Sequence, residues 1–285
     1  MKYKGELLLI ISAFLFSIAS ILVKFISKQF SGMFISLIRF IVGIIMGYFV
    51  LKFQKIPIKI NDTKSWILRG IFGAIGMITM YVGISLTSSG RATMLSNTYP
   101  IFVAFFGWIF FGEKISLNSI LSLILCIIGA VFIFWDNSNY SKLGDFIALI
   151  SGISGGMAIN YLRKGVKFDN PIIIYLSTCI FGLILIPFTL KEWKNINLIN
   201  LLYLFLVAII AFIAQITMTE GYKYINATKG SIISYIGIPL TLLLSYIFVN
   251  EIFKKKFFIG IILISLGLFL TIYIDSLKSK KIHNL

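Results

Sequence analysis

Apolar residues gather in ten segments, each about as long as a membrane crossing, with short polar links between them. The segments lie at 5–26, 32–53, 65–86, 91–111, 116–135, 144–163, 170–190, 199–222, 229–249 and 257–275. A helix needs about 20 apolar residues to cross about 30 Å of hydrocarbon. The pattern therefore predicts ten transmembrane helices, which leave no room for a soluble catalytic or nucleotide-binding domain.

Composition supports the same class of protein. Of 285 residues, 59% are hydrophobic and 13% charged, and the mean hydropathy is +0.98, which excludes an ordinary soluble domain. The net charge of +16 would suggest nucleic acid in a soluble protein. Here the basic residues lie mainly in links and tails, so we expect the lipid bilayer as partner and no nucleic acid.

The distribution of these charges predicts an orientation. More Lys and Arg residues fall in the links and tails on the side of both termini than on the opposite side, although the triplet at 254–256 opposes this. The positive-inside rule then places both termini in the cytoplasm. The abundance of Ile, Lys and Asn suggests an AT-rich bacterial genome and a multi-pass protein of the inner membrane.

Segments three to five return as segments eight to ten, 138 positions later. Ile78-Thr79-Met80 returns as Ile216-Thr217-Met218, and Glu113 and Gly129 return as Glu251 and Gly267. Five crossings per half, an odd number, would start the second half from the opposite side. We therefore predict an all-α membrane protein with ten transmembrane helices in two inverted five-helix repeats (5+5), at 1–136 and 143–278, and a cytoplasmic tail at 279–285. This architecture is characteristic of secondary transporters.

The repeats also carry a family likeness. Pro100-Ile101-Phe102 is followed by Phe111-Gly112-Glu113-Lys114, and Pro239-Leu240 by Asn250-Glu251. This resembles the EamA-type repeat of the drug/metabolite transporter (DMT) superfamily, in which a helix with a proline ends in Leu-Gly-Glu and the next helix carries a glycine. The second half departs from the first in having Asn250 before its Glu, Ser177 opposite Arg39, and Pro239 one register from Pro100.

The resemblance implies a central cavity between two four-helix halves, with peripheral fifth and tenth helices through which two copies could form a homodimer. It also implies a small-molecule substrate, amino acids or similar nitrogenous metabolites. The apolar middles of segments five and ten suit contact with lipid or with another subunit.

Polar residues within the segments are the candidate cavity lining, because each needs a partner or water in the membrane. They are Thr79, Tyr81, Asn97, Tyr99, Asn160, Gln215, Thr217, Thr219, Ser234 and Tyr235. Asn97 and Tyr235 correspond under the offset and lie near Pro100 and Pro239, which weaken their helices and free a carbonyl. Hydrogen bonding between helices without a substrate is the alternative.

Small residues in segment six suggest close helix approach. Gly155 and Gly156, with the serines beside them, would form a pivot or a cavity wall, or simply pack tightly against a neighbouring helix.

Three charges lie inside segments. Arg39 is about seven residues into segment two, where it would bind a substrate carboxylate or hold a structural backbone carbonyl. Arg69 and Glu220 lie at similar depth in segments three and eight, and we hypothesise that they form an inner gate. The alternative is interfacial snorkelling, with Glu220 paired to Lys223.

Charges near the segment ends have simpler interpretations. Lys24 would snorkel at the outer end of segment one, and Glu113 and Glu251 would fix the ends of their own helices.

Residues and motifs that the sequence lacks argue against several classes of function. A carboxylate at mid-depth, as membrane proton relays need, is absent from every segment, which disfavours proton-coupled efflux. The only histidine is His283, so no enzyme, metal site or cofactor is predicted, and no GxxxxGK[ST] loop indicates ATP use. Cys126 and Cys179 are expected as buried hydrophobes.

The best prediction is a secondary transporter that moves a small polar or zwitterionic, amino acid-like metabolite by alternating access, by export or facilitated exchange. One alternative is uptake or exchange of S-adenosylmethionine or a related nucleoside-containing metabolite. A second is a lipid-handling membrane protein without a solute cavity.

Overall fold

A computed structural model of the chain describes residues 4–112, 117–134, 140–225, 233–234, 236–251, 257–267 and 269–270. Its α-helices are α1 (Lys4–Ile26), α2 (Gly32–Phe53), α3 (Thr63–Leu86), α4 (Ser89–Ser96), α5 (Tyr99–Phe111), α6 (Leu117–Phe134), α7 (Lys142–Gly165), α8 (Pro171–Gly182), α9 (Ile186–Thr189), α10 (Leu198–Tyr224) and α12 (Gly237–Val249), with 3₁₀ turns η1 (Leu183–Leu185) and η2 (Leu190–Asn195). A further apolar helix covers Phe257–Gly267.

Within these ranges, seven helical stretches are long and apolar enough to cross a membrane, and Gly237–Val249 and Phe257–Gly267 are shorter apolar helices. Every regular element that the structure describes is helical. The predicted all-helical membrane protein is therefore confirmed at this level.

Side-chain caps explain where several helices begin. Ser31, Asp62, Ser88 and Ser141 each accept a hydrogen bond from the backbone N–H three residues later, at 3.0–3.2 Å. Each side-chain oxygen pairs one N–H that the first turn of a helix leaves without a partner.

Helices α5 and α12 end in the same way despite different residues. Gly112 has φ +68° and Asn250 φ +56°, and their backbone N–H groups donate to the carbonyls of Gly107 and Ser245. Asn tolerates this left-handed conformation better than most residues with a Cβ. The substitution of Asn250 for the glycine therefore preserves the turn, and this sequence departure has no effect on backbone geometry here.

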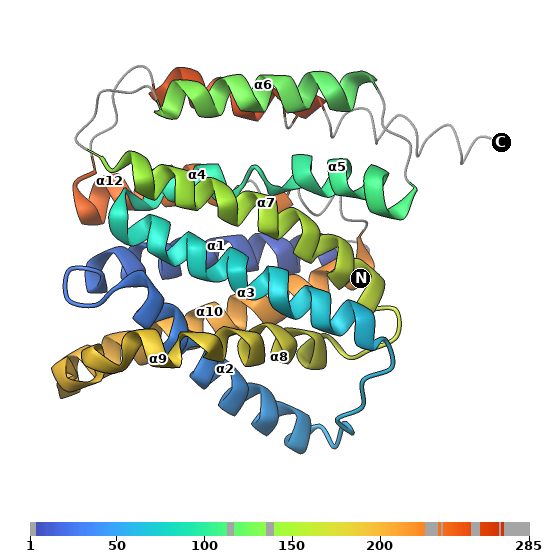
Figure 1. The fold of residues 1–285 in the computed structure, drawn as a ribbon, viewed down its shortest axis with the longest axis vertical. Coiled ribbons are helices and arrows are strands. Elements are labelled where there is room, and N and C mark those ends of the chain that lie inside the picture. Colours follow the sequence, from blue (N-terminus) through green and yellow to red (C-terminus); the bar gives the residue numbers. More distant parts are fainter. Residues whose placement is uncertain are drawn as a thin grey trace.

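Helix packing occurs mainly between the two halves. In Figure 1, α3 lies beside α7 and α1 beside α10. The offset of 138 positions relates α1 to α7, α2 to α8, α3 to α10 and α5 to α12. The α3–α7 contact therefore corresponds to α10–α1, α5–α7 to α12–α1, and α2–α10 to α8–α3. All of these contacts are present. The described part of the chain thus has the contact pattern that an internal repeat predicts.

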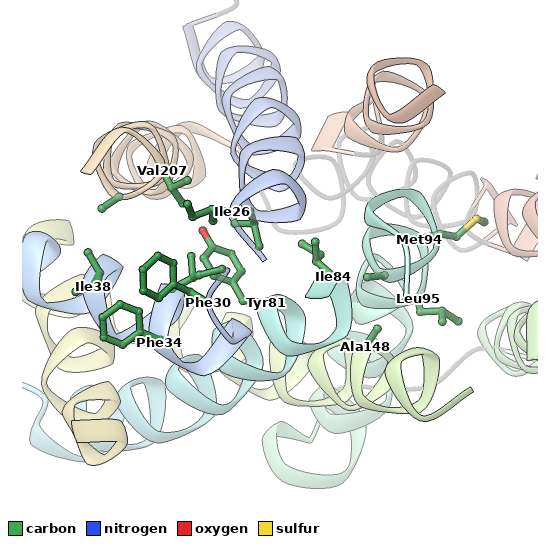
Figure 2. Packing of buried hydrophobic residues seen from close by; sticks show 14 of the residues in the cluster. Ile26, Phe30, Phe34, Ile38, Tyr81, Ile84, Met94, Leu95, Ala148 and Val207 are labelled. Carbon is green, nitrogen blue, oxygen red and sulfur yellow. The ribbon is translucent and has the colours of Figure 1, made fainter. Parts of the chain in front are cut away.

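The largest buried cluster joins both halves near the α2–α3 side. Phe30, Phe34 and Tyr81 pack there with Ile84 and with Val207 of α10 (Figure 2). Phe30 and Phe34 stack with ring centroids 5.1 Å apart. Burial of such side chains contributes about 1.5–3 kcal/mol each in water, whereas in lipid the close packing itself supplies the stabilisation.

Helix α6 and the helix Phe257–Gly267 lie side by side at one edge of the molecule (Figure 1). They touch closely at Gly129, where an added Cβ would lie 2.8 Å from the carbonyl oxygen of Gly260. Their outward faces are apolar, with Ile124 and Ile127 on one helix and Ile262 on the other exposed. This arrangement suits contact with lipid.

Candidate functional site

A cavity of about 180 Å³ lies between the two halves. Its wall comes from α1, α2, α3, α4 and Tyr99 of α5 in the first half, and from α7, Ser234, α10 and α12 in the second. Buried serines and threonines, two arginines, methionines and aromatic rings share this wall. A mixture of apolar surface with a few polar groups is typical of small-molecule sites.

The structure brings about half of the sequence-predicted residues to this cavity. Its lining includes Arg39, Arg69, Tyr81, Asn97, Tyr99, Gly155, Gln215 and Ser234. Thr79, Asn160, Thr217, Thr219, Glu220, Gly156, Pro100 and Pro239 are not among the lining residues. Tyr235 lies outside the described residues.

Three of the residues away from the cavity bond to backbone carbonyls instead. Thr79 Oγ1 donates to the carbonyl of Ile75 at 2.7 Å, Asn160 Nδ2 to that of Val103 at 3.0 Å, and Thr219 Oγ1 to that of Gln215 at 2.8 Å. Only the Asn160 contact joins two helices, as the alternative interpretation describes; Thr79 and Thr219 bond within their own helices.

The helix of segment four is broken at the cavity. Helix α4 ends at Ser96 and α5 starts at Tyr99, with Pro100 in its first turn. Between them, Asn97 Nδ2 donates to the Thr93 carbonyl at 2.8 Å and Thr98 Oγ1 to the Leu95 carbonyl at 2.7 Å. Asn97 lines the cavity, so the interruption places helix ends and a polar side chain at the wall.

Glycines at the cavity differ from glycines that pack. A Cβ added to Gly156 would lie 2.4 Å from Phe102 Cβ, and one added to Gly152 2.5 Å from Thr98 Oγ1. A Cβ on Gly155 or Gly76 would come no closer than 3.3 Å or 3.5 Å to any neighbour. Gly156 therefore packs against α5, whereas at the cavity wall a Cβ on Gly155 would lie tightly against Tyr99 and one on Gly76 would make ordinary van der Waals contact with α7.

Two buried arginines form part of the wall. Arg39 is 3% exposed and Arg69 4%. Arg39 Nη1 donates to the Tyr81 hydroxyl at 2.9 Å, and its guanidinium lies over the rings of Phe16 and Tyr81, 5.8 Å and 5.2 Å from the centroids. Buried nitrogens on both arginines have no hydrogen-bond partner among the described residues.

Arg69 and Glu220 are not paired with each other in this structure. Glu220 forms an ion pair with Lys223 at 2.8 Å, and its side chain is 34% exposed. This is the contact that the snorkelling alternative describes. An inner gate made by Arg69 and Glu220 stays a prediction.

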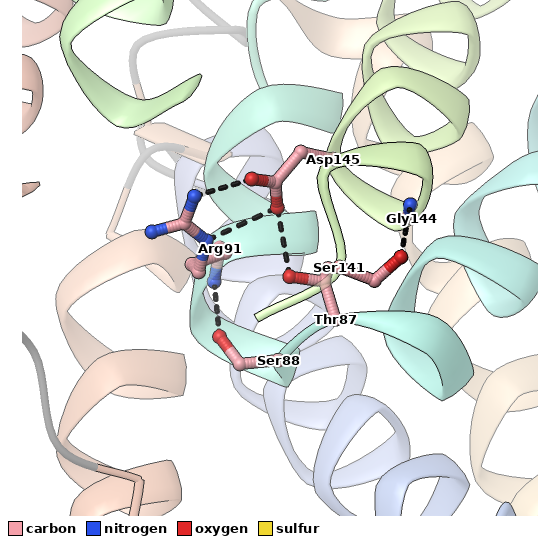
Figure 3. Close-up of polar contacts among 6 residues, drawn as sticks. All are labelled: Thr87, Ser88, Arg91, Ser141, Gly144 and Asp145. Atoms are coloured by element: carbon pink, nitrogen blue, oxygen red, sulfur yellow. Dashed lines mark hydrogen bonds and ion pairs between the residues drawn. The ribbon is translucent and has the colours of Figure 1, made fainter. Parts of the chain in front are cut away.

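A buried ion pair joins α4 and α7 at one end of the bundle, and it was not predicted from the sequence. The Arg91 guanidinium of α4 pairs with the Asp145 carboxylate of α7, which also accepts from the Thr87 hydroxyl at 2.7 Å (Figure 3). Arg91 was not among the candidate site residues, and its side chain is only 1% exposed. The signal was the match between Gly5-Glu6 and Gly144-Asp145, which marks Asp145 as part of the repeat.

Two other charges at this end also differ from expectation. Lys24 does not snorkel: its ammonium donates to the carbonyls of Ile84 and Thr87, at the end of α3. Glu251 does not fix its own helix: its carboxylate accepts from the backbone N–H groups of Ser89 and Gly90, at 2.8 and 3.3 Å. It therefore caps α4, where the helix dipole favours a negative charge.

Several lining residues were not predicted from the sequence. They include Ser12, Ser17 and Ser20 of α1, Thr93 of α4 and Thr241 of α12. Ser17 and Ser20 donate to carbonyls four residues earlier, which satisfies a hydroxyl inside an apolar helix. Their helical spacing in an otherwise apolar segment was the available signal.

In comparison with known proteins, the chain matches the EamA-like transporter family at residues 3–135 and again at residues 142–273. The chain is 22% identical to the pseudopaline exporter CntI of Pseudomonas aeruginosa over 87% of this chain and 88% of the exporter. It is 22% identical to an S-adenosylmethionine uptake transporter of Rickettsia bellii, over 91% of this chain and 90% of that protein.

A mouse relative, solute carrier family 35 member G1, is 30% identical over 65% of this chain and 55% of its own length. A solved crystal structure matches with a TM-score of 0.66 and 14% sequence identity, covering 96% of this chain and 98% of that one. The structural likeness supports a shared fold.

Proposed function

Because the chain belongs to the EamA-like transporter family, we propose that it carries a small polar or zwitterionic metabolite across the bacterial inner membrane by alternating access. The relatives are transporters, so the chain is a transporter and not an enzyme. The observation that carries the proposal is the cavity between the halves, which receives residues from both of them.

The contact pattern supports a carrier built from two inverted five-helix repeats. The α1–α10 and α3–α7 contacts exchange with each other when the halves are exchanged. Two similar packings of the same surfaces could then open the cavity to one side or to the other, as rocking of inverted repeats requires.

The broken helix at the cavity supports substrate binding there. The interruption between α4 and α5 lies at Asn97 and Thr98, and α12 starts at Gly237, the position that corresponds to the start of α5 at Tyr99. Discontinuous helices in transporters direct their ends at the substrate or coupling ion.

Coupling to protons is disfavoured by the lining. Its described residues include no Asp or Glu, although intramembrane proton relays usually use such a side chain. We therefore propose export or facilitated exchange. Cytoplasmic termini, and a homodimer through segments five and ten, belong to the same proposal.

Proteoliposome flux tests the proposal. Purified protein would be reconstituted and screened with radiolabelled pools of amino acids, nucleosides and S-adenosylmethionine, with and without a proton gradient. We expect flux without a gradient. Absence of flux from every pool would contradict the proposal and favour the lipid-handling alternative.

A matched pair of variants tests the path. Gly76→Leu would add a bulky side chain at the cavity wall, where Gly76 lies and where a Cβ would make ordinary van der Waals contact with α7, no closer than 3.5 Å. Ile75→Leu, one residue away on an exposed face, is the control. We expect flux to be lost only in Gly76→Leu, and equal flux in both variants would show that solute does not pass through this cavity.

A further inference from the structure

We propose that Arg39 and Arg69 together form a subsite for an oxyanion, a carboxylate or a phosphate, on the transported solute. The inference rests on the proposed carrier function and names the charge that its substrate bears. Both side chains line the cavity, one from α2 and the other from α3.

The first observation is that the hydrogen-bonding capacity of these two side chains is largely unused. Nε and Nη2 of Arg39 and Nε of Arg69 are buried without a hydrogen-bond partner among the described residues. Beside them, the Thr178 hydroxyl is also buried and unpartnered within the same described ranges. Buried polar atoms in proteins are nearly always paired, so such a concentration of unused donors next to a cavity indicates a missing acceptor.

The second observation is that six acidic side chains of the described residues contact groups outside the cavity. Asp62, Asp145, Asp169, Glu192, Glu220 and Glu251 contact, in order, Ser65, Arg91, Asn61, Ser31, Lys223 and Ser89. The cavity lining holds no Asp or Glu among its described residues. The two arginines therefore line the same cavity without a counter-charge in its lining from the described part of the chain.

The third observation is that the helix surface leaves room for the Arg69 guanidinium. A Cβ added to Gly73 would lie 2.7 Å from Arg69 Nη1 and 2.6 Å from Thr178 Oγ1. Any larger residue at 73 would displace the guanidinium. The glycine thus seats Arg69 against α8 and keeps it at the wall.

Arg39 has partial compensation that does not replace an anion. The faces of Phe16 and Tyr81 flank its guanidinium, and cation–π contacts of this kind stabilise a charge modestly. They stabilise the charge of Arg39 while the subsite holds no anion. The planar forks of two arginines match a carboxylate or a phosphate, which can accept from both.

The test measures binding and stability separately. The wild type in lipid nanodiscs would be heated with succinate, with glycerol 3-phosphate, or with succinamide, which has the shape of succinate without its charges. We expect one or both anions to raise the melting temperature as their concentration rises, and succinamide to have no effect. The two anion arms distinguish a carboxylate from a phosphate.

Variants separate a binding role from a structural one. Arg69→Gln should weaken anion binding about 10- to 100-fold, the equivalent of one charged hydrogen-bonding group, and Arg69→Lys should weaken it less. Without anion, Arg69→Gln should melt no lower than wild type, because it removes a buried charge that has no partner. Lys223→Gln, which removes a positive charge outside the cavity, should bind the anions normally.

The outcomes are distinct for the subsite and for the carrier. Equal responses to succinate and succinamide, or a large fall in the melting temperature of anion-free Arg69→Gln, would overturn the subsite. Flux of an uncharged or cationic solute that Arg69→Gln leaves unchanged would overturn it too while leaving the carrier intact. Anion binding without flux of any labelled solute would support the subsite and overturn the carrier.

Discussion

Neutralising Asp145 should strongly destabilise the folded state. Asp145→Asn keeps the size of the side chain and its hydrogen bond from Thr87, but leaves the Arg91 guanidinium without its carboxylate. Both groups are almost fully buried, at 0% and 1% exposure. The pair joins α4 of the first half to α7 of the second.

The expected magnitude follows from two independent estimates. Opposite unit charges about 4 Å apart interact by about 4 kcal/mol at an effective dielectric constant of about 20. Removing one partner of a buried ion pair costs about 3–5 kcal/mol in measured cases. Since the amide oxygen introduced by the substitution would still accept neutral hydrogen bonds worth about 1 kcal/mol each, we expect Asp145→Asn to lower the free energy of unfolding by about 3 kcal/mol.

Reversible unfolding in mixed micelles with SDS, followed by tryptophan fluorescence, would measure this difference. Thr87→Val is the control, because it removes one hydrogen bond to the same carboxylate at 2.7 Å and keeps both charges. The double variant Arg91→Gln with Asp145→Asn should recover part of the loss, since neither buried charge then remains.

The reasoning fails if the loss in Asp145→Asn is no larger than the loss in Thr87→Val. It also fails if the two single effects at positions 91 and 145 simply add in the double variant, because additivity means that the residues do not interact.

Three further predictions concern stability. Gly156→Ala should cost about 1–3 kcal/mol by overpacking against Phe102, whereas Gly76→Ala should be neutral or stabilising by up to about 1 kcal/mol, as the same SDS titration would show. Asn250→Gly should keep full stability, and Asn250→Leu should lose about 1–2 kcal/mol, because Asn250 has φ +56°. Hydrogen bonds from Ser65 lower the pKa of Asp62, so its contribution to stability is complete above the ordinary pKa of about 4 and is lost as the pH falls through the lowered value. Melting curves from pH 7 to 3 should show this loss in wild type and less of it in Asp62→Asn, while Asp62→Ala should lose about 0.5–2 kcal/mol of capping at neutral pH.

The sequence predicted the helix ranges and the repeat well, because these features depend on simple physical requirements. The apolar segments predicted the ranges of α1, α2 and α3 to within two residues, because a membrane crossing requires a minimum apolar length. The offset of 138 positions also indicated which helices correspond, and the exchanged contacts agree with it.

Side-chain partners were harder to predict. Arg91 and Asp145 are 54 positions apart, and their pairing depends on how α4 crosses α7. Glu251 lies beside its own helix in sequence but caps α4 of the other half. Polarity alone also could not separate Asn97 from Asn160, because both amides donate to backbone carbonyls and only Asn97 lines the cavity.

The exchange of packing partners between the halves has a consequence for how the chain is made. Helices α1 and α3 find their main neighbours in α10 and α7, which the ribosome synthesises later. Helices α1 and α3 must therefore remain in the bilayer without their main packing neighbours until the second half has been inserted. Neither half has a complete interior of its own, so the chain can reach its final packing only as one cooperative unit.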